Sequence, residues 1–174
     1  MNASTSNQRG VALVVVMVLL LVMTLLGLAA LRSTLMEERM TANMVDRSLS
    51  FQAAEAALRE GEVIALLPAT RAAVPATAGA CSNGICAQPD ATQADKWLTS
   101  FNGWRAATTN VGTLATAPQF FIEYMGDAPT WPGCDRVDES NRSPLCMRPR
   151  YRITARSEAA DRAAVLLQTN LIAP

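Results

Sequence analysis

Hydrophobic positions are concentrated near the start of the chain. Residues 1–10 are polar, and the next 21 residues, 11–31, carry no charged side chain. A helix of that length spans about 31 Å, which matches the hydrocarbon core of a bilayer at about 30 Å. The pattern therefore predicts a membrane-spanning helix at residues 11–31.

Helix-forming residues continue beyond this apolar block. Residues 32–60 contain neither glycine nor proline, and Glu55 precedes Arg59 by one turn in the order that stabilises a helix. Pro68 interrupts the pattern, because proline lacks the N–H that a helix interior requires. The sequence predicts one helix over residues 11–67, roughly 85 Å long.

The distal part of this helix has a surface suited to packing. Residues 53–57 include four alanines, which form a thin face against which a sheet can pack closely. Phe51 and Leu58 supply larger apolar groups beside that face. A helix this long cannot lie inside a small domain, so we expect its first half to be buried in lipid or among partner helices.

Three later segments alternate between apolar and polar residues, as strands with one buried face do. These segments are residues 119–125, 150–156 and 163–171, and residues 157–162 connect the last two as a hairpin. The alternation predicts a small antiparallel sheet. Packed on the distal part of the long helix, this sheet makes an α+β fold.

The segment between helix and sheet is less regular. Residues 68–95 are rich in Ala, Thr, Pro and Gly, which predicts a loop. Trp97, Leu98, Phe101 and Trp104 follow at three- and four-residue spacings. We expect one face of a short helix here, packed into the core.

All four cysteines, Cys81, Cys86, Cys134 and Cys146, lie after the apolar block. Cysteines confined to the region beyond a membrane anchor indicate an oxidising compartment and disulfide bonds. Three pairings are possible, and the local one, which closes two short loops, is favoured. Gaps of four and eleven residues do not suit a zinc site built from four thiolates.

Charge and residue usage narrow the function. The chain has 15 basic and 15 acidic side chains, without the basic excess of a nucleic-acid-binding protein. It has no histidine, the commonest general base and zinc ligand. No G-x-S-x-G nucleophile motif or glycine-rich phosphate loop occurs. We therefore predict that the protein is not an enzyme and needs no cofactor.

The segment between the last two cysteines contains candidate calcium ligands. Asp135, Asp138 and Glu139 supply carboxylate oxygens, which Ca²⁺ prefers. Their spacing does not match a known calcium loop, and Arg136 and Arg142 lie beside them as counter-charges. A solvated acidic loop without metal is the favoured interpretation.

Several motifs resemble one family. Arg9-Gly10 followed directly by a long apolar helix resembles a class III prepilin leader. The runs EERMTAN at residues 37–43 and DRSLSFQAAEAAL at residues 46–58 are similar to the PilX group of minor pilins of the type IV pilus. The run YRITAR at residues 151–156 resembles the same group.

The resemblance implies maturation by a prepilin peptidase. This enzyme would cut between Gly10 and Val11 on the cytoplasmic side, and the new amine of Val11 would then be methylated. The chain would then comprise a leader, a transmembrane assembly helix, the periplasmic half of that helix and a disulfide-bonded pilin-like globular domain, at residues 1–10, 11–32, 33–67 and 68–174.

The sequence departs from the usual pilin pattern at two positions. Type IV pilins commonly begin the mature chain with Phe and carry Glu at its fifth position, whereas this chain has Val11 and Val15. In pilins that carboxylate is thought to pair with the terminal amine of a neighbouring subunit. A subunit without it would join a growing stack poorly but could begin one. The expected position is at or near the pilus tip.

The resemblance also implies partners and location. The partners would be other minor pilins and the major pilin through the N-terminal helix, a tip adhesin, the prepilin peptidase and the inner membrane. The globular domain would lie in the periplasm before assembly and in the pilus afterwards. Two alternatives stay open. One is an uncleaved single-pass inner-membrane protein with a periplasmic protein-binding domain, and the other is a minor pseudopilin of type II secretion.

Overall fold

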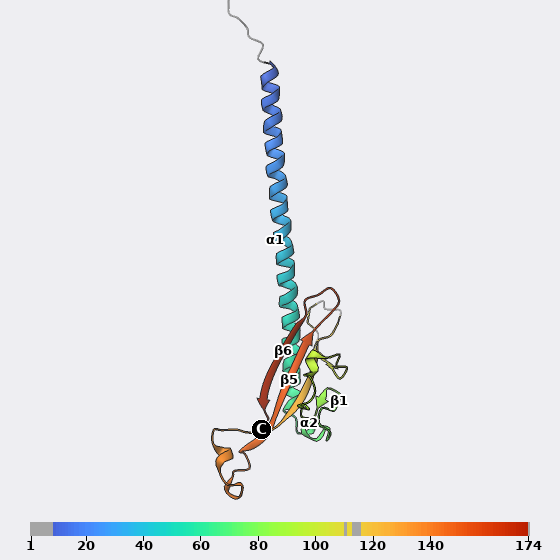
Figure 1. Ribbon diagram of the computed structural model, residues 1–174, viewed down its shortest axis with the longest axis vertical. Helices are drawn as coiled ribbons and strands as arrows, with labels where there is room; N and C mark the ends of the chain where they lie inside the picture. The colour runs from blue at the N-terminus through green and yellow to red at the C-terminus, as the bar shows by residue number, and fades with distance from the viewer. Residues whose placement is uncertain (1–8, 110, 113–115, 174) are drawn as a thin grey trace, which may run out of the picture. The chain divides into compact units, whose positions relative to one another are not determined.

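A computed structural model describes residues 9–109, 111–112 and 116–173, in two compact units, Met1–Met44 and Val45–Pro174. Helix α1, Arg9–Ala65, passes through the boundary between them (Figure 1). The predicted long helix is present, and it ends at Ala65 rather than at residue 67. Pro68 instead begins the short helix α2, Pro68–Ala72, because its fixed φ suits the first turn of a helix.

In the first unit, the described side chains of residues 10–44 are all exposed. In the described part of the chain, α1 is the one helix long and apolar enough to cross a membrane. The hydroxyl of Thr24, a polar group inside the apolar block, donates a hydrogen bond to the carbonyl of Leu21 at 2.8 Å. No polar side chain in this block therefore needs a partner from outside the helix.

The second unit contains one six-stranded sheet. Its order is β1-β2-β4-β5-β6, and β3 pairs with β4. The strands are β1 Cys81–Ser82, β2 Ile85–Cys86, β3 Arg105–Ala106, β4 Gln119–Pro129, β5 Met147–Ser157 and β6 Val165–Ile172.

The three predicted strands correspond to β4, β5 and β6, which pair antiparallel in that order. The α+β prediction is confirmed, but the sheet is mixed rather than purely antiparallel. Strand β2 pairs in parallel with β4, with Ile85 opposite Ile122. Strands of two residues are too short to show an alternation, so the sequence pattern did not reveal them.

Strand β4 extends beyond its predicted end at Met125. The pairing with β5 shifts between Tyr124 and Asp127, around Gly126 at φ +85°. This irregularity interrupts the alternation that marks a strand, and the ladder resumes beyond it as far as Pro129. The hydroxyl of Tyr124 donates to Asp127 Oδ1 across the interruption at 2.7 Å.

The core lies between the distal part of α1 and one face of the sheet. Three of the four alanines of the predicted thin face are fully buried and Ala56 is half-buried. The facing strand residues Phe120, Tyr151 and Ile153 are also fully buried. Gly61 makes this close approach possible, because a Cβ there would lie 2.7 Å from Ile153 Cγ2. The expectation that Phe51 packs on the sheet is wrong, since its side chain is 50% exposed.

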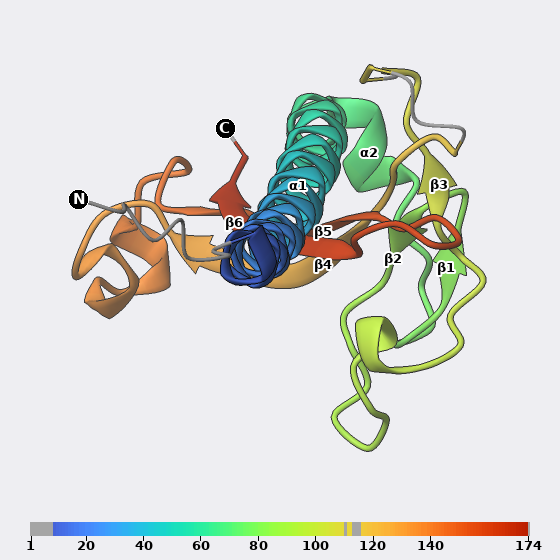
Figure 2. The same ribbon diagram turned by 90° about the horizontal axis from the view of Figure 1, so that it is seen from above.

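The other face of the sheet is covered by the segment before β3 (Figure 2). Phe101 and Trp104 both contact Phe121 edge to face, with ring centroids 5.1 and 4.7 Å apart. The predicted short helix is reduced to a single turn, η1 Lys96–Leu98, and Leu98 is 74% exposed. These aromatic residues pack on the outer face of β4 and not along one helical stripe.

Candidate assembly helix and disulfide-closed loops

The predicted maturation site lies in the first turn of α1. Gly10 and Val11 are both exposed, and nothing lies within 4 Å of the position that a Cβ on Gly10 would take. Val15 stands one turn further on, also exposed. No residue from Val11 to Met36 is acidic, so this half of the helix offers no carboxylate to a neighbouring amine.

The first disulfide closes the β1–β2 hairpin. Cys81 lies directly opposite Cys86 in the ladder, with their Cα atoms 4.0 Å apart. Gly84, at φ +77°, occupies the turn, and its carbonyl accepts a hydrogen bond from the amide of Ile122 at 2.8 Å. A side chain there would also collide with Arg105, whose Cβ is 2.6 Å from the position of a Cβ on Gly84. The hairpin is thus held against β4.

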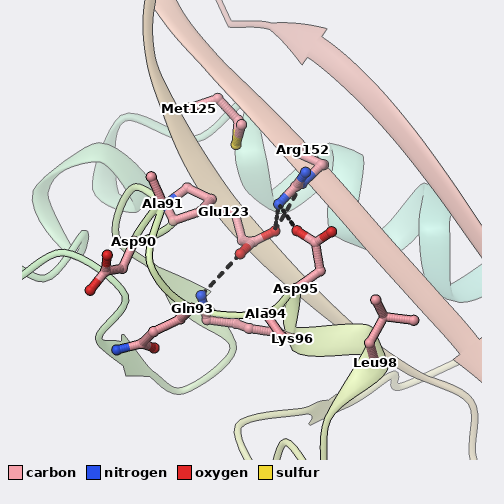
Figure 3. A pocket seen from close by; sticks show the side chains of 11 residues that line it. Asp90, Ala91, Gln93, Ala94, Asp95, Lys96, Leu98, Glu123, Met125 and Arg152 are labelled. Atoms are coloured by element: carbon pink, nitrogen blue, oxygen red, sulfur yellow. Dashed lines mark hydrogen bonds and ion pairs between the residues drawn. The ribbon is translucent and has the colours of Figure 1, made fainter.

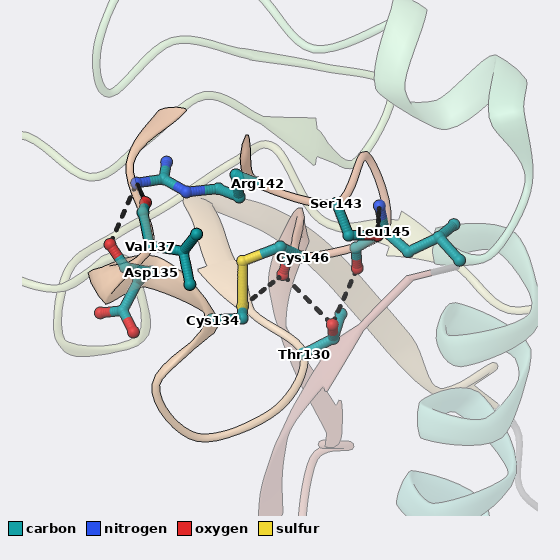
Figure 4. The surroundings of a disulfide bond; sticks show 8 residues. All are labelled: Thr130, Cys134, Asp135, Val137, Arg142, Ser143, Leu145 and Cys146. Atoms are coloured by element: carbon teal, nitrogen blue, oxygen red, sulfur yellow. Dashed lines mark hydrogen bonds between the residues drawn. A yellow bond between two sulfur atoms is a disulfide. The ribbon is translucent and has the colours of Figure 1, made fainter. Parts of the chain in front are cut away.

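The second disulfide joins Cys134 to Cys146, with Cα atoms 5.7 Å apart, and closes the loop between β4 and β5 (Figure 4). The two bonds are the local pairing that the sequence favoured. Thr130 ties the loop to its base, because its amide donates to the carbonyl of Cys146 and its hydroxyl to that of Leu145, both at 2.8 Å. Both cysteines are buried, so the bond anchors the loop within the protein.

The calcium candidates do not converge. Asp135, Asp138 and Glu139 are exposed, and the described residues include no group of three or more acidic, histidine or cysteine side chains suited to a metal ion. Arg142 does not act as the expected counter-charge. Its Nη2 donates to the backbone carbonyls of Asp135 and Val137, each at 3.0 Å, and so shapes the loop (Figure 4).

A buried ionic cluster lies on the outer face of the sheet (Figure 3). Glu123 on β4 is 1% exposed and accepts from Lys96 Nζ at 3.1 Å and from Arg152 Nη2 at 2.8 Å. Arg152 also approaches Asp95 at 3.6 Å. The cluster borders a cavity of about 380 Å³. The ammonium group of Lys96, the only lysine of the chain, is therefore paired with the buried carboxylate of Glu123.

Two stacked arginines extend this cluster along β5. The Arg152 guanidinium lies 4.5 Å from the centre of the Trp97 ring, and that of Arg156 lies 4.2 Å from the Trp104 ring. Sequence reasoning missed these contacts, although the period of two on β4 and β5 places Glu123, Arg152 and Arg156 on the same face. The contacts hold the segment before β3 on the sheet.

Two carboxylates of α1 hold loops of the second unit. Asp46 pairs with Arg162 and accepts from the amide of Ala163 at 2.6 Å. Glu60 accepts from the amides of Thr108 and Thr109 at 2.8 and 3.2 Å. Burial raises the pKa of Glu60, but these hydrogen bonds outweigh it, and the pKa lies below its usual value.

Two protein-family models together match most of the chain. The model described as PilX N-terminal matches residues 9–59, and the model described as Type IV pilus assembly protein PilX C-term matches residues 77–173. The chain belongs to the PilX family. It is a minor pilin of the type IV pilus and a structural component of that fibre. Searches of curated proteins and of solved structures found no significant match.

The two PilX matches divide the chain near the end of α1. The N-terminal match contains the apolar helix and the alanine face, and the C-terminal match contains both disulfides and the whole sheet. The resemblance seen in the first third of the sequence is thereby confirmed, and it extends into the middle region, where the motifs were not distinctive. The long apolar helix fits membrane anchoring and association with the pilus.

Proposed function

We propose that this PilX-family minor pilin helps to begin type IV pilus assembly, at or near the tip, together with other minor pilins and a tip adhesin. The observation that carries the proposal is Val15. It takes the position at which most pilins place the glutamate that meets a neighbour's amine. The exposed apolar surface of α1 around it offers no substitute.

The physical argument concerns a charge in an apolar environment. A charged group at the centre of a membrane costs about 2.5 to 3.5 kcal/mol on insertion scales unless a partner offsets it. A subunit with valine at this position leaves the amine of an adjoining subunit without that partner. Joining an existing stack is therefore unfavourable, whereas the first subunit of a fibre has no such requirement.

The proposal includes maturation and location. The prepilin peptidase cuts between Gly10 and Val11 and methylates Val11, while the helix stands in the inner membrane and the second unit lies in the periplasm. Disulfides in that unit support an oxidising compartment. Apolar side chains along residues 11–31 then exchange lipid for the helices of other pilins during assembly.

The decisive experiment is intact-mass and N-terminal analysis of the protein from the membrane of a pilus-forming host, with and without its prepilin peptidase. A mature chain that begins at methylated Val11, and that is absent without the peptidase, supports the proposal. A chain that retains residues 1–10 in both strains contradicts it. The uncleaved membrane protein with a periplasmic binding domain is then the better account.

The tip position has its own test. Val15→Glu restores the carboxylate, and we expect the variant to enter pilus shafts and to start fewer pili than the native chain. Val16→Glu is the matched control, because it adds the same charge about 100° away around the helix. Pilus counts and gold labelling of the subunit measure both effects. Unchanged piliation and unchanged incorporation with Val15→Glu would contradict the tip proposal.

A further inference from the structure

Strand β6 forms one edge of the sheet (Figure 1). All its residues pair with β5 in one unbroken register, from Val165 opposite Ser157 to Ile172 opposite Arg150. On its other side no strand is present among the residues that the structure describes. Strand β6 therefore presents a regular edge of its full length.

Backbone groups of alternate residues point away from the sheet. The amide of Ala173 donates to the carbonyl of Pro149 at 2.9 Å, so the backbone groups of this residue face β5. Backbone direction alternates along an antiparallel strand. Every second residue therefore directs its N–H and C=O outward, and these residues are Leu166, Gln168, Asn170 and Ile172.

The residues and the register of β6 lack the features that usually protect an edge strand from pairing. Natural edge strands carry charges, prolines or bulges that prevent another strand from adding to them. Residues 165–172 include no charged residue and no proline, and their register with β5 has no shift. Leu166 and Ile172 are 45% and 40% exposed. Such an edge is suited to accept a strand.

The order of residues along β6 is chemically symmetric about Thr169. The residues on either side of Thr169, Gln168 and Asn170, both carry an amide side chain. Two residues from Thr169, positions 167 and 171 are both leucine. Three residues from it, positions 166 and 172 are a leucine and an isoleucine. An antiparallel copy of the strand therefore places like beside like at every position.

We propose that β6 pairs antiparallel with β6 of a second copy of this chain, about a two-fold axis at Thr169. In this register Gln168 faces Asn170 of the other copy, and Leu166 faces Ile172. These are the residues whose backbone groups point outward, so each such pair exchanges two hydrogen bonds. The strand carries no charge that would repel its copy.

The pairing needs only the second unit and does not depend on the proposed role at the pilus tip. It reverses the direction of β6 between the copies, and with it that of residues 45–65 of α1, which belong to the same unit. Neighbours in one fibre run in the same direction and cannot form this pair. In a pilus protein the pair joins copies carried by different fibres.

The register can be tested by cysteine cross-linking of the full chain in detergent. All four native cysteines are paired, so an added cysteine is the one free thiol. Across the axis, the two Thr169 Cα atoms would lie about 4.5 Å apart, within disulfide range. The two Gln168 Cα atoms would lie roughly 8 to 9 Å apart, beyond that range.

We expect Thr169→Cys to form a covalent dimer under mild oxidation at least about tenfold faster than Gln168→Cys. Equal rates, or no dimer from either variant, would overturn the proposal. A cross-link from Thr169→Cys to a different protein in pilus-forming cells, without a dimer of the pure chain, would also overturn it. That result would identify another subunit as the occupant of the edge.

A second measurement uses protein without added cysteine. Gln168→Pro removes an outward backbone amide and leaves the backbone hydrogen bonds to β5 intact, although it loses the side-chain hydrogen bond from Gln168 Nε2 to Thr154 Oγ1. We expect it to weaken the dimer about tenfold or more in sedimentation experiments. Gln168→Ala keeps the amide and should leave the dimer unchanged. A native chain that stays monomeric throughout the accessible concentration range would contradict the pairing.

Discussion

Helix α1 carries large apolar side chains where its own chain leaves them exposed and small ones where its own sheet covers them. Residues 11–31 are mostly valine and leucine and are all exposed. In the second unit the buried helix positions are mainly alanine, with Gly61 at the closest approach to β5. The first part is thus built to be buried by lipid or other subunits, and the second by the chain itself.

This difference shows that hydrophobicity and burial are separate properties of a helix. A leucine-rich surface gains the most free energy when it leaves water, but it needs a partner large enough to cover it. An alanine-rich surface gains less per residue but lets a sheet approach closely and fit its larger side chains. One continuous helix can therefore serve an assembly at one end and a folded domain at the other.

The largest effect is expected from the ionic cluster that supports the second unit. Glu123→Ala leaves Lys96 and Arg152 close together without their buried carboxylate, and breaking such a pair costs about 3 to 5 kcal/mol. Thermal unfolding followed by tryptophan fluorescence should show a much lower midpoint, while membrane association persists. Glu37→Ala, in the exposed first unit, is the control and should leave the midpoint unchanged. Equal midpoints for the two variants would contradict this structural role.

A smaller effect, which tests the comparison most directly, is expected from substitutions of two glycines inside α1. Gly61→Leu places a side chain where even a Cβ would contact Ile153, and overpacking of this kind costs about 1 to 3 kcal/mol. Gly27→Leu meets nothing within 4 Å and should leave the second unit as stable as before. Chemical denaturation in detergent measures both variants. If Gly61→Leu unfolded at the native denaturant concentration, the close packing of α1 on the sheet would be refuted.

The smallest effect concerns acid. The pKa of Glu60 lies below its usual value of 4.5 in the folded chain, so the folded state holds its proton less tightly than the unfolded state. Its contribution to stability is present above pH 4.5 and is lost as the pH falls through the lower, folded value. Unfolding midpoints of the native chain and Glu60→Gln should therefore converge as the pH falls below 4.5. A constant difference across that range would contradict this role of Glu60.

Local patterns in the sequence were enough to predict several parts of the protein. An uncharged apolar block of 21 residues predicted a helix long enough to cross a membrane, and the period of two identified β4, β5 and β6. The short spacings of the cysteines favoured the two disulfides that are present. The motifs at residues 37–58 indicated the PilX family. In each case neighbouring residues along the chain carry the signal.

Contacts between distant segments were decided only by the tertiary structure. The parallel pairing of β2 with β4 joins segments separated by more than thirty residues, and strands of two residues leave no periodic signal. Glu123 has no local feature that marks it as buried, because its burial depends on Lys96 and Arg152 from other segments. A glycine inside a helix ordinarily lowers its stability, and the role of Gly61 follows only from the position of Ile153. Periodicity shows which residues lie on the same face of a helix or strand. Packing depends on which other segments of the chain lie against that face.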